Sequence, residues 1–509
     1  MWDTTKQPPP QMQQQHPQMQ PPIQVQVYNI PASSVPQYPA VQPVQQNEGW
    51  LKRNNKNKPQ SNSVGTASLI FISGGMNMAW NLGLGFNSIN NSFIVTEHMI
   101  LSWFIGGIIG AVVGAFACNH VSKKLLMCFS SILVTIVGIL QVSDPNSYEA
   151  IIASRYLNGI AVGLVFPMTF VLVGEEVVKQ MRGMNAGSVD TMSFSCGIFI
   201  QIIYSVTWST GVDDYFQSIQ MSGVLNIIYG IIAFIMGAML IIESPVLHLA
   251  HGEEQLAIDS LRRLQRPFTI TYETYEQLEE HKRYLAENNE RSFMQNAAYG
   301  IPALLKLCFY RSFSALGFSY FVNFAFTYSA LVTTRLQIYP FILYAFARWL
   351  GPLIVSFTLD SRGRKSPMIV GFFVCTILAF TVGGIFDNKL NFIDFDYMNA
   401  VKYMLIIYQL FASMSMASSS AYLSEAFPLA VKPYYVAIVF IVEMLVHIII
   451  ISCKDSLINI MLHVSDYFLT LGALSLVYLG VAVYVMPETK WCSLRECLPK
   501  LRNLNNFRN

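Results

Sequence analysis

The sequence predicts an all-α membrane protein with twelve transmembrane helices in two six-helix bundles. Composition is the first observation behind this prediction: 53% of the 509 residues are hydrophobic and only 12% are charged, about half the charged fraction of a typical soluble domain. The second is a series of apolar runs, each close to the roughly 20 residues that a helix needs to span a bilayer. The third is that charged residues gather between these runs, where they stay in water.

Residues 1–64 differ in composition from the rest of the chain. They are rich in proline and glutamine and show almost no apolar periodicity. We expect a disordered tail, because such a segment cannot bury enough apolar surface to offset its ordering entropy. Lys52, Arg53, Lys56 and Lys58 precede the first apolar run, and this basic cluster predicts a cytoplasmic N-terminus.

Six apolar runs form a predicted N-terminal bundle over 65–245, and six more form a C-terminal bundle over 304–490. The polar stretch 246–303 carries opposite charges three or four residues apart, which predicts two to four short cytoplasmic surface helices. Twelve crossings from a cytoplasmic start make 491–509 a cytoplasmic tail, and basic residues concentrate in the loops on that side. The approximate limits of the runs are 66–88, 98–118, 124–142, 150–174, 185–208, 221–242, 306–330, 337–358, 367–386, 401–423, 434–453 and 466–486.

The turn between the eighth and ninth runs is strongly charged. It reads L-D-S-R-G-R-K over 359–365 and carries four charges in seven residues. Arginine and lysine cost about 2.5–3.5 kcal/mol each at the bilayer centre, so we expect a tight turn in water on the cytoplasmic side. Gly363 permits the sharp reversal of the chain.

The two halves of the chain repeat one another. Three pairs of segments match in the same order: 119–124 with 360–365, Glu175 and Arg182 with Glu425 and Lys432, and 243–245 with 487–490. Duplicated six-helix halves are typical of secondary transporters, which bind their solute between two rocking halves.

These motifs resemble the sugar porter family of the major facilitator superfamily, and within it the insect trehalose and hexose facilitators. The resemblance covers about 66–492 and implies a secondary transporter, not an enzyme. It further implies a small polar solute, by default hexose or trehalose, moved by alternating access across the plasma membrane. The motifs are R-Y-L-N-G-I-A-V-G at 155–163, Glu175 with Arg182-Gly183, E-S-P at 243–245, D-S-R-G-R-K at 360–365, Y-L-S-E-A-F-P at 422–428 and P-E-T-K at 487–490.

The resemblance also implies a cytoplasmic charge lattice that joins helix ends of the two bundles and parts when the carrier opens inward. Surface ion pairs contribute about 1 kcal/mol or less each, yet a network of them biases a two-state equilibrium whose gap is a few kcal/mol. The alternative is that these charges only anchor helix ends. The residues assigned to gating are Arg155, Glu175, Arg182, Asp360, Arg364, Glu425 and Lys432.

The solute pocket departs from the pattern of the family. In the seventh span, Phe313, Ser314 and Ser319 stand where the family carries sugar-binding Gln and Asn residues. In the tenth span, M-A-S-S-S ending at Ser420 replaces Gly-Pro-x-Pro-Trp. The usual Gln of the fifth span falls near Asp190 or Thr191, depending on the alignment. A carrier of a charged solute, such as a carboxylate or amino acid, and a non-transporting sensor are therefore alternative functions.

Two charged residues take positions that face the expected pocket, Arg348 in the eighth span and Glu443 in the eleventh. Ionisable groups inside a membrane are expensive and usually face a cavity, and pairing lowers their cost. We expect Arg348 and Glu443 to meet near the central cavity, where they either contact solute or a proton or only cross-link helices. The candidate solute-binding residues are Arg348, Glu443, Asp190, Asn323, Ser314 and Ser420.

Other function classes find no support in the sequence. The net charge of +2 does not indicate a nucleic-acid partner, and we find no P-loop, metal-ligand spacing or cofactor motif. The expected partners are the lipid bilayer, the solute and, in a symporter, protons. The first span carries Asn87 where proton-coupled relatives carry an acid, which favours facilitated diffusion.

Overall fold

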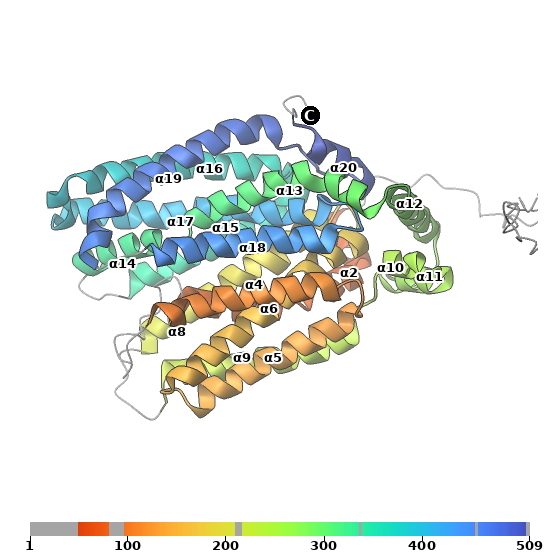
Figure 1. The fold of residues 1–509 in the computed structure, drawn as a ribbon, viewed down its shortest axis with the longest axis horizontal. Coiled ribbons are helices and arrows are strands. Elements are labelled where there is room, and N and C mark those ends of the chain that lie inside the picture. The colour runs from red at the N-terminus through yellow and green to blue at the C-terminus, as the bar shows by residue number, and fades with distance from the viewer. Residues whose placement is uncertain (1–48, 81–95, 209–215, 335–337, 454–456, 505–509) are drawn as a thin grey trace, which may run out of the picture. The chain divides into compact units, whose positions relative to one another are not determined.

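A computed structural model describes residues 49–80, 96–208, 216–334, 338–453 and 457–504. Residues 46–509 form one compact unit, and its described part is helical and contains no β-strand. Within the described residues, eleven helices are long and apolar enough to cross a membrane, and the shorter apolar α3 (Ser68–Ala79) takes the place of the first span. The predicted all-α membrane fold is confirmed (Figure 1).

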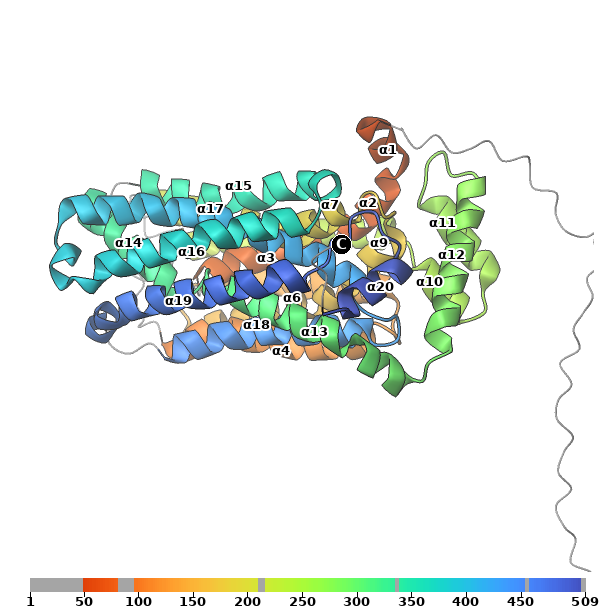
Figure 2. The ribbon, with the colours of Figure 1, turned by 90° about the horizontal axis from the view of Figure 1, so that it is seen from above.

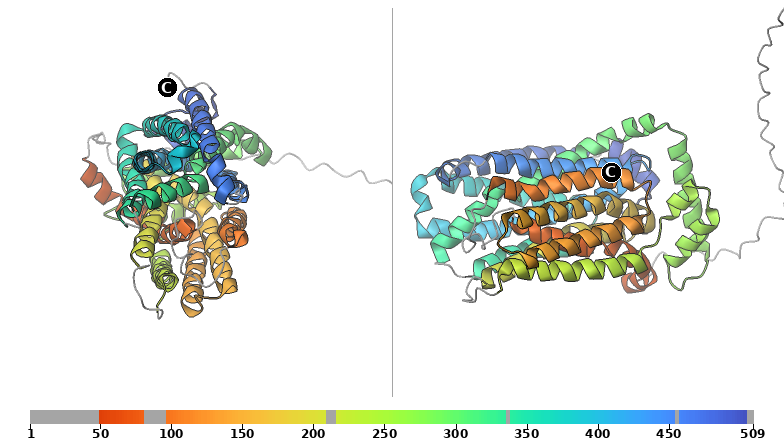
Figure 3. Two further views of the ribbon diagram at one scale, coloured as in Figure 1. Left: turned by 90° about the vertical axis from the view of Figure 1, so that its left-hand side faces the viewer. Right: turned by 60° about the horizontal axis from the view of Figure 1, so that its bottom comes forward.

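Six spans build each bundle. In the end-on view of Figure 3 the N-terminal helices, orange to yellow, lie below the C-terminal helices, which run from green to blue. The N-terminal bundle comprises α3, α4 (Glu97–Ala117), α5 (Lys123–Ser143), α6 (Tyr148–Glu176), α7 (Arg182–Gly187) continued by the π-helical η4 (Ser188–Met192) and α8 (Ser193–Trp208), and α9 (Ser218–Leu240). The C-terminal bundle comprises α13 (Phe293–Leu316) continued by α14 (Tyr320–Thr334), α15 (Tyr339–Arg362), α16 (Lys365–Asp387), the short 3₁₀ turn η5 (Lys389–Phe392), α17 (Phe395–Glu425), α18 (Lys432–Ser452) and α19 (Leu457–Val485).

Small residues let helices inside a bundle approach closely. A Cβ at Gly110 of α4 would lie 2.3 Å from the carbonyl oxygen of Ile160, and one at Gly163 of α6 would lie 2.2 Å from that of Gly107. On each helix a second glycine lies four residues away, Gly106 on α4 and Gly159 on α6, and this spacing is common where membrane helices pack closely. The R-Y-L-N-G-I-A-V-G motif therefore packs α6 against α4.

The most extensive contacts between the bundles are those of α4 with α18 and of α8 with α15. These are the second span with the eleventh and the fifth with the eighth. The second span corresponds to the eighth in the other half, and the eleventh corresponds to the fifth. Exchanging the two halves therefore converts one pair into the other. The interface therefore has the pseudo-two-fold relation that duplicated halves require.

The inter-bundle linker forms three helices, within the predicted range: α10 (Pro245–Ala250), α11 (Glu254–Arg263) and α12 (Tyr272–Asn289). They lie at one end of the helices, the end that also carries α2 and α20 (Figure 2). The linker is shorter than expected, because Ser292 caps α13 and starts that helix at Phe293 rather than near residue 304. Residues 494–502 of the expected tail form α20 (Leu494–Arg502), which buries one apolar side.

The expected disorder of residues 1–64 is wrong for its last part. Residues 1–48 lie outside the described residues, but α1 (Trp50–Lys56) and α2 (Lys58–Gly65) are helices. Contacts with the bundle explain the difference for α2. The backbone N–H of Val178 donates to the Gln60 side chain at 3.0 Å, and that of Ile242 donates to the Ser63 hydroxyl at 3.2 Å. Composition does not reveal such contacts.

Candidate functional site

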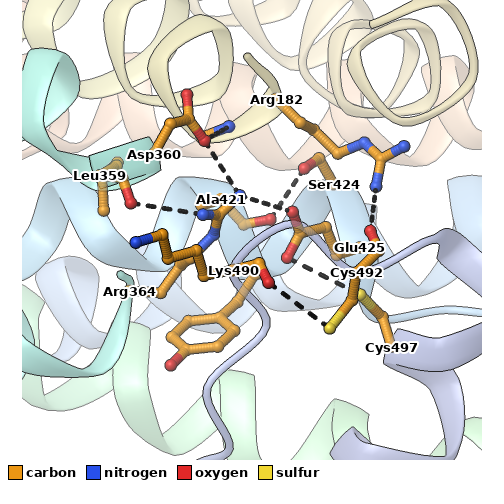
Figure 4. A network of polar contacts seen from close by, with 12 residues as sticks. Arg182, Leu359, Asp360, Arg364, Ala421, Ser424, Glu425, Lys490, Cys492 and Cys497 are labelled. Carbon is orange, nitrogen blue, oxygen red and sulfur yellow. Dashed lines mark hydrogen bonds and ion pairs between the residues drawn. The ribbon is translucent and has the colours of Figure 1, made fainter. Parts of the chain in front are cut away.

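A network of charged groups joins the bundles at the end that carries the linker helices. Asp360 lies in the last turn of α15, and its carboxylate accepts hydrogen bonds from the backbone N–H groups of Gly183, at 3.1 Å, and Met184, at 2.8 Å, on α7. The guanidinium of Arg364 lies 3.1 Å from Asp360 and 3.0 Å from Glu425 (Figure 4). We call this set, which links both bundles, the inner charge network.

Arg364 is the centre of the inner charge network. Its side chain is fully buried, and burial disfavours its charge, but the carboxylates of Glu425 and Asp360 raise the pKa of the guanidinium above its usual value. Glu488 of the P-E-T-K motif accepts hydrogen bonds from the backbone N–H groups of Arg364 and Lys365, at 3.0 and 3.1 Å. Gly363 has a φ of +96°, so the turn holds a backbone conformation that favours glycine.

The N-terminal members of the predicted lattice are arranged differently. Glu175 accepts a short hydrogen bond from the Ser244 hydroxyl, and Arg182 donates to the carbonyl oxygen of Cys492 at 3.4 Å. Arg182 thus joins the N-terminal bundle to the segment after α19. The Lys432 ammonium group is buried and has no hydrogen-bond partner among the described residues. The inner end therefore holds both groups of residues. Asp360 and Glu425 form one connected network around Arg364, and Glu175, Arg182 and Lys432 lie beside that network.

Arg155 does not belong to the inner charge network. It lies 20 residues before Glu175 on the same helix, which separates them by about 30 Å at 1.5 Å per residue. Its guanidinium donates to the carbonyl oxygen of Met99 at 3.1 Å and lies 4.6 Å from the centre of the Trp80 ring. The predicted place of Arg155 in the cytoplasmic charge lattice is wrong, because the motif lies at the opposite end of α6, where Arg155 joins helices of one bundle.

A cavity of about 50 Å³ lies between the bundles. It is far smaller than the roughly 300–1,000 Å³ of typical ligand pockets. Ionisable residues of both bundles line it, namely Asp190, Arg311, Arg348, Glu443 and His447. Most of the remaining wall is apolar and includes Met78, Trp103, Phe166, Phe194, Phe318 and Phe440.

Arg311 on α13 holds the two carboxylates of the cavity. Its guanidinium forms a short ion pair with Asp190 and lies 3.2 Å from Glu443. The Ser420 hydroxyl donates to Asp190 at 2.6 Å. Asp190 belongs to the N-terminal bundle and the other three to the C-terminal bundle. We call these four residues the central charge cluster; it connects the bundles at the cavity wall.

The predicted pairing of Arg348 with Glu443 is wrong. Among the described residues no carboxylate lies within 4 Å of Arg348, whose guanidinium carbon sits 4.3 Å from the centre of the Phe318 ring. Arg311 takes the place that we expected Arg348 to fill. Sequence reasoning missed Arg311, although Asp190 and Glu443 are two acids inside apolar runs and the seventh run contains one arginine, in K-L-C-F-Y-R-S-F. Charge balance inside the membrane is the signal that points to it.

The other predicted solute-binding residues divide into two groups. Asp190, Glu443 and Ser420 meet in the central charge cluster. Asn323 instead stabilises the break between α13 and α14: its amide donates to the carbonyl oxygens of Phe318 and Ser319 and its oxygen accepts from Tyr344. Neither Asn323 nor Ser314 is among the described residues that line the cavity. Within the described chain, no group of three His, Cys, Asp or Glu side chains is arranged to hold a metal ion.

Comparison with known proteins defines the family. The family described as "Sugar (and other) transporter" matches residues 28–499. The chain belongs to this family. Proteins similar to it include the arabinose-proton symporter of Escherichia coli (strain K12), 21% identical over 443 residues, which cover 83% of this chain and 89% of that protein. The galactose-proton symporter of the same strain is 22% identical over 460 residues, covering 87% of this chain and 95% of that protein.

The solved structures agree with this assignment at the level of the fold. A proton:xylose symporter of the major facilitator superfamily, solved with 6-bromo-6-deoxy-D-glucose, superposes with a TM-score of 0.70 at 18% identity, covering 87% of this chain and 100% of that chain. The chain therefore has the major facilitator fold. It is a multi-pass membrane transporter of the sugar porter type and not an enzyme.

Proposed function

We propose that this transporter moves a small polar solute by alternating access and binds it in the cavity between the bundles. The observation that carries the proposal is the contact of Asp360 with the backbone of Gly183 and Met184. It joins the two halves at the inner end, while residues of both halves line the cavity. When these hydrogen bonds part, the cavity opens to the inner side, which we place in the cytoplasm together with both termini.

A sugar is the cargo that family membership favours. The similar proteins named above carry arabinose, galactose or xylose in their names, which supports a monosaccharide. A hexose, or trehalose as in the insect facilitators, remains the specific prediction from the sequence, and the plasma membrane remains the predicted location.

Facilitated diffusion is the transport mode that we propose. It rests on the first-span sequence G-F-N-S-I-N, whose residues 85–90 lie outside the described residues. The test is uptake of labelled solute into vesicles with an inward proton gradient, with and without a protonophore. A facilitator reaches the same final level in both, whereas accumulation that the protonophore abolishes identifies a symporter.

Reconstitution of the full chain into lipid vesicles tests transport itself. We expect saturable uptake of at least one solute from a panel of hexoses, pentoses, trehalose and their acids. Asp360→Ala is expected to lower the rate, because it removes the inter-bundle hydrogen bonds, whereas Asp259→Ala on the exposed side of α11 is the matched control. Binding without any flux contradicts the carrier and supports the sensor.

A further inference from the structure

Arg348 is a buried cation without an anion. The residue is 4% exposed and lines the cavity. Among the described residues no carboxylate lies within 4 Å of it, and its Nη1 atom has no hydrogen-bond partner. The neighbouring Phe318 ring, at 4.3 Å, supplies a cation–π contact. Such a contact compensates only part of the cost of removing a charge from water.

The cavity has no spare acid for Arg348. Its two carboxylates, Asp190 and Glu443, both contact Arg311. An excess negative charge in that cluster is neutralised when a carboxylate takes up a proton, but an arginine side chain does not release its proton in proteins. The remaining ionisable group of the wall, His447, is also buried, with an Nδ1 atom that has no partner among the described residues. An imidazole adds a hydrogen-bonding group but no anion.

The neutral polar groups of the wall are few. Three of the described residues that line the cavity carry an uncharged hydroxyl group, namely Thr191, Ser195 and Ser413. No Asn or Gln side chain is among the described lining residues. A neutral hexose needs many hydrogen-bonding partners when it leaves water, because each unpaired polar group costs free energy on burial. The wall therefore suits a solute that brings a negative charge better than one that brings only hydroxyl groups.

We propose that Arg348 forms a carboxylate-binding subsite in the cavity and that this transporter moves a small organic carboxylate in place of the neutral sugar that family membership favours. A guanidinium presents two parallel N–H groups that match the two oxygens of a carboxylate. Phe318 holds the guanidinium from one face, so its edge remains available to the ligand. The inference rests on the proposed carrier function and specifies its substrate. A sugar acid and a simple aliphatic acid share this chemistry.

Equilibrium binding to the full-length protein in lipid nanodiscs tests the subsite. Two matched pairs of probes isolate the charge: butyrate against butyramide, and glucuronate against glucose. We expect the carboxylate of at least one pair to bind about 10- to 100-fold more tightly than its neutral partner. Binding of glucuronate alone identifies a sugar acid, and binding of butyrate alone identifies an aliphatic acid; either supports the proposal.

Variants assign the preference to one residue. Arg348→Gln is expected to abolish the preference for the carboxylate, and Arg348→Lys to retain part of it, since lysine keeps the charge but not the planar fork. Arg263→Gln, on the exposed surface of α11, is the control and should bind as wild type does. If Arg348→Gln does not fold, Arg348→Lys still tests the subsite. The proposal requires that Arg348→Lys prefer the carboxylate over its neutral partner less strongly than wild type does.

The outcomes separate this inference from the proposed function. Equal affinity for the charged and neutral partners, or a preference that survives Arg348→Gln, overturns the subsite. Flux of neutral hexose that Arg348→Gln leaves unchanged also overturns it, while transport stands. Carboxylate binding that Arg348→Gln abolishes, in a protein that moves no solute through vesicles, supports the subsite and contradicts the carrier.

Discussion

Asp190 in the N-terminal bundle and Arg311 in the C-terminal bundle form an ion pair across the interface between the two halves. Both side chains are 2% exposed, so the pair lies away from water. A buried charge that loses its partner is strongly unfavourable. Any movement that separates the bundles at the cavity must therefore break this pair, replace one partner with solute or proton, or pivot about it.

Removal of Arg311 tests the role of the central charge cluster in stability. Arg311→Met leaves Asp190 and Glu443 buried without a cation, and we expect the free energy of unfolding to fall by about 3–5 kcal/mol. The triple variant Arg311→Met, Asp190→Asn, Glu443→Gln removes the charges together and should recover most of that loss. Denaturant unfolding in detergent measures both, with Arg263→Met as the surface control. A triple variant as unstable as the single one contradicts the interpretation.

The inner charge network was accessible from the sequence, whereas the central charge cluster was accessible only in part. Asp360, Arg364 and Glu425 stand in short motifs that occur once in each half, and the repeat places them at helix ends on one side. Their ion pairs in the structure follow from that placement. Arg155 shows the limit of motif reasoning: its motif marks a close contact between α4 and α6 and says nothing about the inner end.

The partner of Glu443 depends on the rotation of α13 and α15 about their own axes. Arg311 and Arg348 both lie in apolar spans, and counting from a motif places each only within about one residue, which on a helix is a rotation of about 100°. The seventh span is also interrupted after Leu316, which changes the positions of its residues relative to those of a continuous helix. A pairing of side chains across bundles needs these rotations, which the sequence does not contain.

Gly183 offers a steric test of the contact between the bundles. A Cβ at Gly183 would lie 2.7 Å from Oδ1 of Asp360 and 3.1 Å from Cβ of Leu359. Gly183→Ala should therefore push α15 away from α7 and weaken the two hydrogen bonds that the Asp360 carboxylate accepts from α7. A hydrogen bond to a charged group contributes about 1.5–3 kcal/mol. We expect the inward-open population to rise about tenfold or more.

Distances between nitroxide labels on Val121→Cys and Arg362→Cys, in a background without native cysteines, measure this change. The labels lie on exposed residues at the inner ends of the two bundles. The distribution should gain a longer distance in Gly183→Ala and remain as in the parent in Gly384→Ala, where a Cβ meets nothing within 4 Å. An unchanged distribution in Gly183→Ala would show that the contact with Asp360 does not hold the inner side closed.

Gly363 tests the turn that positions Arg364. With a φ of +96° and a Cβ position 2.3 Å from Oε2 of Glu488, Gly363→Ala combines backbone strain with displacement of the Glu488 carboxylate. Strained backbone of this kind costs about 1–3 kcal/mol, so we expect a loss of that order in the free energy of unfolding. Gly480→Ala, whose Cβ meets nothing within 4 Å, is the matched control and should be neutral or stabilising. Equal stability of the two variants contradicts the prediction.

Cys492 provides a chemical probe beside Arg182 in the inner region. A hydrogen bond with the Cys497 thiol and the ammonium group of Lys500, 3.1 Å from its sulfur, outweigh partial burial and lower the pKa of the Cys492 thiol to about 6. The thiolate is the form that reacts with iodoacetamide. A lowered pKa means that the thiolate forms as pH rises through about 6, so the alkylation rate should reach its plateau near pH 7 rather than continue to rise toward pH 9.

Two variants separate the causes of this shift. Cys497→Ala and Lys500→Met each remove a stabiliser of the thiolate, so both should raise the pKa of Cys492. Alkylation at pH 7 should slow about twofold when the pKa reaches 7 and about tenfold for each further pKa unit. Mass spectrometry of the peptide that contains Cys492, after short pulses of iodoacetamide between pH 5 and 9, gives the rate profile. Because the carbonyl oxygen of Cys492 accepts from Arg182, a solute that closes the inner side should also slow the reaction. Profiles that neither variant moves would show that these neighbours do not set the reactivity of Cys492.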